Sequence, residues 1–128
     1  MRRLTVLVFA ALLVAVPALA QDPTVVDPDH YSVEFETDDF RVLRISYGPG
    51  ESSVMHEHPA GYVLAITDAH LMMHLADGQS VEVDLTAGVN GWAEATVHAP
   101  ENLSDARIEV YLIELTDDDD DDDDEDDD

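Results

Sequence analysis

The chain has 128 residues, which suits a single ordinary domain, and without cysteine it cannot use disulfide bonds. Its 30 acidic residues outnumber five arginines, lysine does not occur, and the formal net charge at pH 7 is −25. This charge excludes nucleic-acid binding, because contacts to phosphate groups require a cationic surface.

The first 20 residues have the pattern of a secretory signal peptide. Met1–Arg3 is basic, Leu4–Ala15 is almost continuously apolar, and Ala18–Ala20 has the small-x-small pattern of a cleavage site. We therefore expect residues 1–20 to be removed, which predicts a secreted or periplasmic protein without membrane contact after cleavage. The alternative is an uncleaved membrane anchor, although the apolar stretch is short for a membrane span.

The rest of the chain, up to residue 116, has the pattern of a β protein. Residues 21–30 contain two Asp-Pro pairs and are expected to form a turn-rich leader. Short alternating stretches follow, separated by turns rich in glycine, proline and aspartate. The expected strands are 31–36, 40–47, 54–58, 62–67, 70–76, 81–85, 92–97 and 107–115. Short strands at this spacing predict an all-β sandwich or barrel over residues 31–116.

Two histidines lie two residues apart in the stretch GPGESSVMHEHPAGY, residues 48–62. Residues i and i+2 of a strand project from the same face, so His56 and His58 point together while Glu57 points away. Two neutral imidazoles on one face suit zinc, iron, copper, nickel or manganese. On its own this pair is a weak signal, because many such pairs are ordinary surface residues.

The stretch HLMMHL, residues 70–75, places a second histidine pair, His70 and His74, on one face of an expected strand. If its leucines and second methionine face the core, both histidines are solvated, and we prefer this interpretation. A soft-metal site that includes Met72 is the alternative. His30, in the leader, is expected to be exposed.

A third histidine, in the stretch HAPEN, extends the pattern. The spacings are Gly50-x5-His56-x-His58 and, about forty residues later, His98-x3-Asn102. Together they resemble the two sequence motifs of the cupin superfamily. The resemblance spans about Phe40 to Leu115, includes RVLRISYGPGE and HAPENLSDARIEVYLIEL, and is strongest to small single-domain cupins. It implies a double-stranded β-helix, or jelly-roll, barrel.

The resemblance also implies a metal site formed by three histidines, His56, His58 and His98, with open positions for water or substrate. The chain departs from the family pattern, because Tyr62 and Val63 occupy the positions where a ligand glutamate is expected. Glu94 is a candidate replacement ligand. Glu101 is the other carboxylate near the motif, and no clear general base is visible.

Three interpretations of the site remain open. It is a three-histidine site for a divalent transition metal, a degraded site without metal, or an adventitious zinc or copper site. The first predicts a small-molecule pocket and a metal-dependent oxygenase or isomerase for a small anionic compound. The rival is a non-catalytic ligand-binding or structural cupin, and a homodimer is expected to cover an exposed strand edge. Trp92 and Tyr62 are candidates for lining the barrel mouth, or for the core.

The last twelve residues, 117–128, are all acidic and are expected to be disordered, because such a segment cannot bury apolar surface. The absence of lysine beside an excess of aspartate favours adaptation to high salt, where ions screen the repulsion between carboxylates. The alternative role for this tail is the low-affinity capture of calcium or of cationic partners.

Overall fold

The computed structural model describes residues 21–116, so the expected signal peptide and the acidic tail lie outside the described residues. One helical turn, α1 (Pro23–Val26), precedes the strands. The strands are β1 (Tyr31–Glu36), β2 (Phe40–Tyr47), β3 (His56–His58), β4 (Gly61–Ala65), β5 (Ala69–Leu75), β6 (Ser80–Leu85), β7 (Asn90–Ala93), β8 (Thr96–Asn102) and β9 (Ile108–Leu115). Within residues 21–116, no helix is long and apolar enough to cross a membrane.

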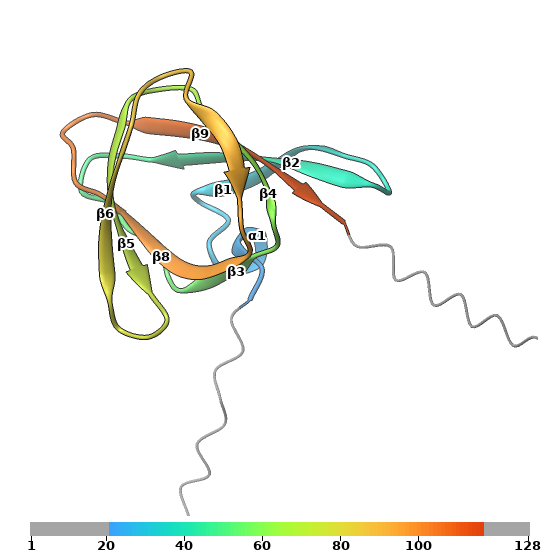
Figure 1. Cartoon of the computed structure of the whole chain (residues 1–128), viewed down its shortest axis with the longest axis horizontal. Coiled ribbons are helices and arrows are strands. Elements are labelled where there is room, and N and C mark those ends of the chain that lie inside the picture. The colour runs from blue at the N-terminus through green and yellow to red at the C-terminus, as the bar shows by residue number, and fades with distance from the viewer. Residues whose placement is uncertain (1–20, 117–128) are drawn as a thin grey trace, which may run out of the picture.

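The strands form two antiparallel sheets that close into a barrel (Figure 1). The larger sheet has the strand order β1-β2-β9-β4-β7, and the smaller has the order β3-β8-β5-β6. Consecutive strands often lie in different sheets, so the chain repeatedly crosses between them. This architecture confirms the expected all-β jelly-roll barrel, a double-stranded β-helix.

The core lies between the sheets and follows the two-residue period of the strands. On β9, Ile108, Val110 and Leu112 alternate inward and are 1–8% exposed, while the residues between them are only partly buried. Leu43 and Tyr47 on β2 are buried from the facing positions of the same sheet. Alternation therefore determines which side chains reach the barrel interior.

The expected strand at 92–97 is wrong. β7 ends at Ala93 and pairs with β4 in the larger sheet, whereas β8 begins at Thr96 and pairs with β3 and β5 in the smaller sheet. Residues 94–95 make the crossing between the two sheets. This crossing could not be predicted from the sequence, because residues 94–95 include no glycine or proline that would indicate a turn.

Two smaller differences concern residues before the His56–His58 pair. The strand expected to start at Val54 starts at His56, because the Val54 carbonyl accepts a hydrogen bond from the His56 side chain instead of pairing in a ladder. The leader contains the short helix α1, which the sequence did not predict. Its start has ordinary helix chemistry: Asp22 caps the Thr24 N–H at 2.8 Å, and Pro23 occupies the first turn.

Asn102, the last residue of the HAPEN stretch, is buried, and its side chain connects two segments of the chain by hydrogen bonds. Its side-chain N–H groups donate to the carbonyls of Tyr47, Gly48 and Ala106 at 3.2, 3.0 and 2.8 Å. Its Oδ1 accepts from the backbone N–H and the hydroxyl of Ser104. The amide thus ties the end of β2 to the loop after β8, which positions the strand that carries His98.

Candidate metal centre

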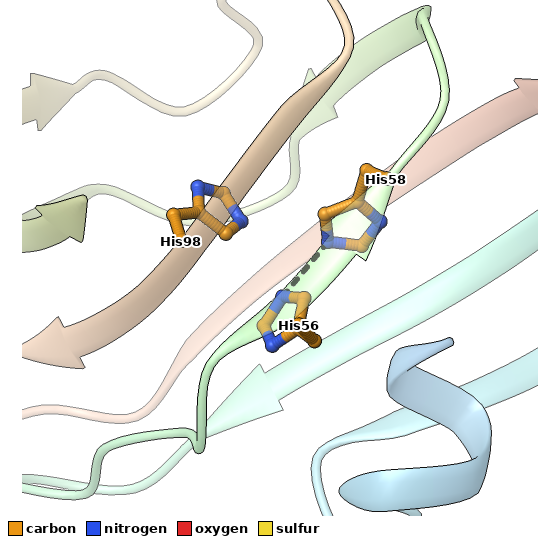
Figure 2. A group of neighbouring side chains, drawn as sticks. All are labelled: His56, His58 and His98. Atoms are coloured by element: carbon orange, nitrogen blue, oxygen red, sulfur yellow. Dashed lines mark hydrogen bonds between the residues drawn. The ribbon is translucent and has the colours of Figure 1, made fainter. Parts of the chain in front are cut away.

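The three histidines that the sequence singled out meet inside the barrel (Figure 2). His56 and His58 project from β3, and His98 projects from the neighbouring strand β8, where it lies directly opposite His56. One ring nitrogen from each histidine lies within 4.8 Å of the others. His56 and His58 are 0% and 4% exposed, so these two rings are shielded from bulk water, while His98 is partly buried.

The hydrogen bonds of two of these histidines determine which ring nitrogen carries the proton. Nδ1 of His56 lies 2.9 Å from the carbonyl oxygen of Val54, which can only accept, so this nitrogen is the protonated one. Nδ1 of His58 lies 2.6 Å from Oε1 of Glu114, a carboxylate that also accepts. With Nδ1 protonated, Nε2 is the nitrogen of each ring whose lone pair is available to a metal.

These lone pairs converge. Nε2 of His56 lies 3.0 Å from Nε2 of His58 (Figure 2), a contact between two acceptors that requires a proton or a metal cation to be favourable. Nε2 of His98 is buried and has no hydrogen-bond partner among the described residues. A buried nitrogen without a partner is costly, so this atom also suits an electrophilic ligand. The donor set fits a transition-metal ion.

Burial keeps the rings of His56 and His98 neutral, which is the form that ligates a metal. Desolvation lowers the pKa of His56 to about 4, and the neighbouring His58 acts in the same direction. Desolvation lowers the pKa of His98 to about 3, assisted by the two neighbouring histidines. Neither ring competes for a proton at neutral pH.

Glu114 on β9 accepts a hydrogen bond from His58. It was not among the site residues predicted from the sequence. Its side chain is 1% exposed, and its second oxygen accepts a hydrogen bond from Nε of Arg41 at 2.6 Å. The Arg41 guanidinium also contacts Asp22 in the leader. A chain of charged groups thus runs from the histidine cluster to the surface, and each buried charge has a partner.

A signal for this pair was present in the sequence. On the strand 108–115, Glu114 continues the inward series of apolar residues, and Arg41 continues the inward series of the paired strand 40–47. The two residues are also direct register partners. A carboxylate and a guanidinium at inward positions of two long strands predict a buried ion pair.

A cavity of about 110 Å³ adjoins the cluster and is lined mainly by apolar side chains. His58 and His98 line it, together with the buried Tyr31 and Tyr47, whose hydroxyl groups hydrogen bond to each other. Burial raises the pKa of both tyrosines, so they remain neutral phenols. Their inward orientation follows from strand alternation, but no sequence motif connects them with the histidine cluster.

The carboxylates near the motif have different environments. Glu94 lines the cavity at the crossing between the sheets, yet it does not belong to the cluster of closely spaced donors. Glu101 is not near the site: it lies on β8 and hydrogen bonds to the exposed His74 at 2.9 Å. Glu94 is therefore the remaining carboxylate candidate in the cavity.

Tyr62 and Trp92 were predicted to line the barrel mouth or to lie in the core, and both predictions are wrong. Tyr62 on β4 and Trp92 on β7 are register partners, and they are 41% and 55% exposed. On β4 the inward positions belong to Gly61, Val63 and Ala65, so Tyr62 projects outward. An all-apolar strand gives no alternation from which its inner face could be predicted.

The remaining histidines lie away from the cluster. His70 and His74 are partly solvent-exposed, as the preferred interpretation of HLMMHL predicted, and they hydrogen bond to Glu82 and Glu101. The expectation that His30 is exposed is wrong. Its side chain is 16% exposed, stacks on Tyr47, and is fixed by carboxylates on both ring nitrogens.

Comparison with family models and with curated proteins found no match. Several solved structures are similar. A cupin domain from Bordetella pertussis is 26% identical, with a TM-score of 0.63, and the alignment covers 68% of this chain and 92% of that one. A cupin superfamily protein from Desulfitobacterium hafniense is 18% identical, with a TM-score of 0.52 and coverage of 68% and 76%. A protein with a double-stranded β-helix domain from Klebsiella pneumoniae is 23% identical, with a TM-score of 0.51 and coverage of 68% and 83%.

The lowered pKa of His98 predicts a loss of stability in mild acid. The folded state binds fewer protons than the unfolded chain, so this contribution is complete above about pH 6.5 and disappears as the pH falls towards 3. Between pH 7 and pH 5 the metal-free protein should lose about 2 kcal/mol of unfolding free energy that a His98→Gln variant does not lose. Urea denaturation at both pH values, with chelator present, measures this difference. Equal losses in the two proteins would contradict the assignment.

Proposed function

Since the chain is a member of the cupin superfamily, we propose that it binds one divalent transition metal through three histidines and a small anionic compound in the adjoining cavity. The proposed ligands are His56, His58 and His98. The observation that carries this proposal is that one ring nitrogen of each histidine lies within 4.8 Å of the others. The Nε2 atoms of His56 and His58 face each other, and Nε2 of His98 is buried without a partner among the described residues. Iron, manganese, nickel, copper and zinc all accept imidazole ligands.

The preference for an anionic compound follows from the ligand set. Three neutral imidazoles leave the full positive charge of a divalent ion uncompensated, which favours carboxylates or enolates in the open positions. The ion would supply Lewis acidity, or oxygen activation if it is iron. Oxygenation or isomerisation of such a compound is therefore the reaction class that we propose.

The residues of this chain set the size and the environment of the substrate. The cavity volume of about 110 Å³ is smaller than the roughly 150 Å³ of an engineered cavity that holds benzene, so the buried part of the compound has few heavy atoms. The mainly apolar lining excludes water and strengthens electrostatic contacts. Glu94 is the carboxylate among the lining residues, and we propose that it accepts a proton from a bound compound.

A second candidate is a non-catalytic cupin that binds a ligand without transforming it. The observation that favours it is that no carboxylate of the described residues belongs to the histidine cluster, so no general base lies among the donors. Turnover of a small carboxylate by the metal-loaded protein, and its loss in the variant described next, would decide for the enzyme.

Metal binding is tested with protein purified without a histidine tag. Wild-type protein should contain about one equivalent of metal by elemental analysis, and His98→Ala should contain little or none, because the remaining pair is a much weaker site. His70→Ala is the control, since His70 lies outside the cluster and pairs with Glu82. Wild-type protein that stays metal-free after incubation with each candidate ion would contradict the proposal.

Glu114 should act on metal affinity as a positioning residue. Glu114→Gln removes the carboxylate that orients His58 and selects its tautomer, and changes to such partners typically lower metal affinity 10–100-fold. Calorimetric titration with zinc measures the change, and circular dichroism checks that the variant is folded. Glu101→Gln, which removes a carboxylate from an exposed histidine, is the matched control. An unchanged affinity in Glu114→Gln would show that the carboxylate has only a structural role.

We also propose that the protein is exported, on the basis of the basic, apolar and small-residue segments in residues 1–20. Export would place the metal site outside the cytoplasm. Mass spectrometry of protein recovered from the periplasm or the medium should show an N-terminus at Gln21. Full-length protein retained in the membrane fraction would instead support the uncleaved anchor.

A further inference from the structure

The wall of the cavity beside the histidine cluster consists mostly of apolar side chains. Ile108, Val110 and Leu112 contribute from β9, and Val63 and Met73 join them from β4 and β5. An apolar cavity stays dry and takes up apolar guests. An engineered cavity of roughly 150 Å³ holds the six carbon atoms of benzene, so the volume of about 110 Å³ found here accommodates roughly four.

Few polar groups of the wall are free to bind a guest. The hydroxyl groups of Tyr31 and Tyr47 hydrogen bond to each other. His58 and His98 belong to the cluster of metal donors, at one part of the wall. A hydroxyl or amide group that is buried without a hydrogen-bond partner costs free energy. The part of the compound that enters the cavity is therefore apolar.

The charges around the cavity limit the compound to one carboxylate. Glu94 is the carboxylate of the wall and is solvent-exposed, so it lies where the cavity meets water, and Thr96 is the remaining polar lining residue. The negative charge of Glu94 opposes the entry of a second carboxylate. No arginine lines the cavity to compensate it. The three arginines of the described residues bind elsewhere, Arg41 to Glu114, Arg44 to Glu109 and Arg107 to Ser46.

We propose that the compound is an aliphatic monocarboxylate whose apolar body of roughly four carbon atoms fills the cavity. Its carboxylate takes an open position at the metal, so this inference rests on the proposed function. The histidine cluster then binds the charged end, and the apolar wall binds the chain. Acids with hydroxyl groups along the chain, or with a carboxylate at each end, are disfavoured by the same wall.

Met73 is the side chain that determines how much of the chain the cavity accepts. Its register partner on β8 is Pro100, two residues from His98, and all three residues line the cavity. Met73 and His98 therefore lie diagonally across neighbouring strands on the inward face, within reach of a long side chain. The thioether chain is unbranched and flexible, so it fills the space beside the cluster.

The proposal is tested by calorimetric titration of zinc-loaded wild-type protein with acetate, propionate, butyrate, pentanoate and hexanoate. Each buried methylene should tighten binding about fourfold, or about 60-fold from acetate to pentanoate, and hexanoate should gain nothing further. Glutarate, in which a carboxylate replaces the terminal methyl group of pentanoate, should bind at least tenfold more weakly than pentanoate.

The outcomes separate this inference from the proposed function. An affinity that does not depend on chain length, or glutarate that binds as tightly as pentanoate, would overturn this inference and leave the metal site standing. Protein that takes up no zinc would overturn both. The metal-free protein tests the cavity directly, because xenon enters dry apolar cavities. Wild-type protein that shows no bound xenon by NMR would contradict the apolar guest.

Two substitutions change the cavity in opposite directions. Met73→Ala enlarges it and should move the end of the chain-length gain to acids longer than pentanoate, whereas Ala93→Leu fills it from β7 and should abolish the gain and the xenon signal. Met72→Ala is the control, because Met72 lies on the outer face, opposite Glu82 and Glu101. Circular dichroism checks folding, and Ala93→Leu decides alone if Met73→Ala does not fold. A chain-length profile that neither substitution changes, or that the control changes equally, would refute the assignment.

Discussion

The buried carboxylate of Glu114 is the interaction on which the histidine centre depends. It lies between the proposed ligand His58 and a permanent cation, Arg41, so one side chain both orients the ring of His58 and compensates a buried charge. This requirement connects three parts of the chain: the strand with the histidine pair, the final strand, and the leader through Asp22. A barrel without disulfide bonds thus uses a buried ionic network to hold its leader against the site.

Much of the fold and the three histidines could be predicted because both depend on local pattern. Most strand positions follow from two-residue alternation between turn residues, and His56 and His58 share a face wherever that stretch is extended. The meeting with His98 could not be derived from spacing alone. It required the resemblance to a known barrel, because β3 and β8 become neighbours only through the pairing of the whole sheet.

The features that could not be predicted from the sequence depend on tertiary structure. The crossing between β7 and β8 has no turn residue, and the apolar strand β4 does not show which side faces inward. Tyr62 and Trp92 therefore could not be assigned to the outer face before the strand register was known. His30 was misjudged because its partners lie in different parts of the chain, Asp27 in the leader and Glu51 in a loop beyond β2.

The direct opposition of His56 and His98 has a consequence for the kinetics of folding. Four strands, β4–β7, lie between β3 and β8 in the chain, so the two imidazoles come together only when β3 and β8 have paired in the smaller sheet. Contacts of such long sequence separation must first offset a large loss of loop-closure entropy, so we expect them to form late in folding. An ion held by these side chains would therefore slow the opening of the finished barrel while leaving its rate of formation nearly unchanged.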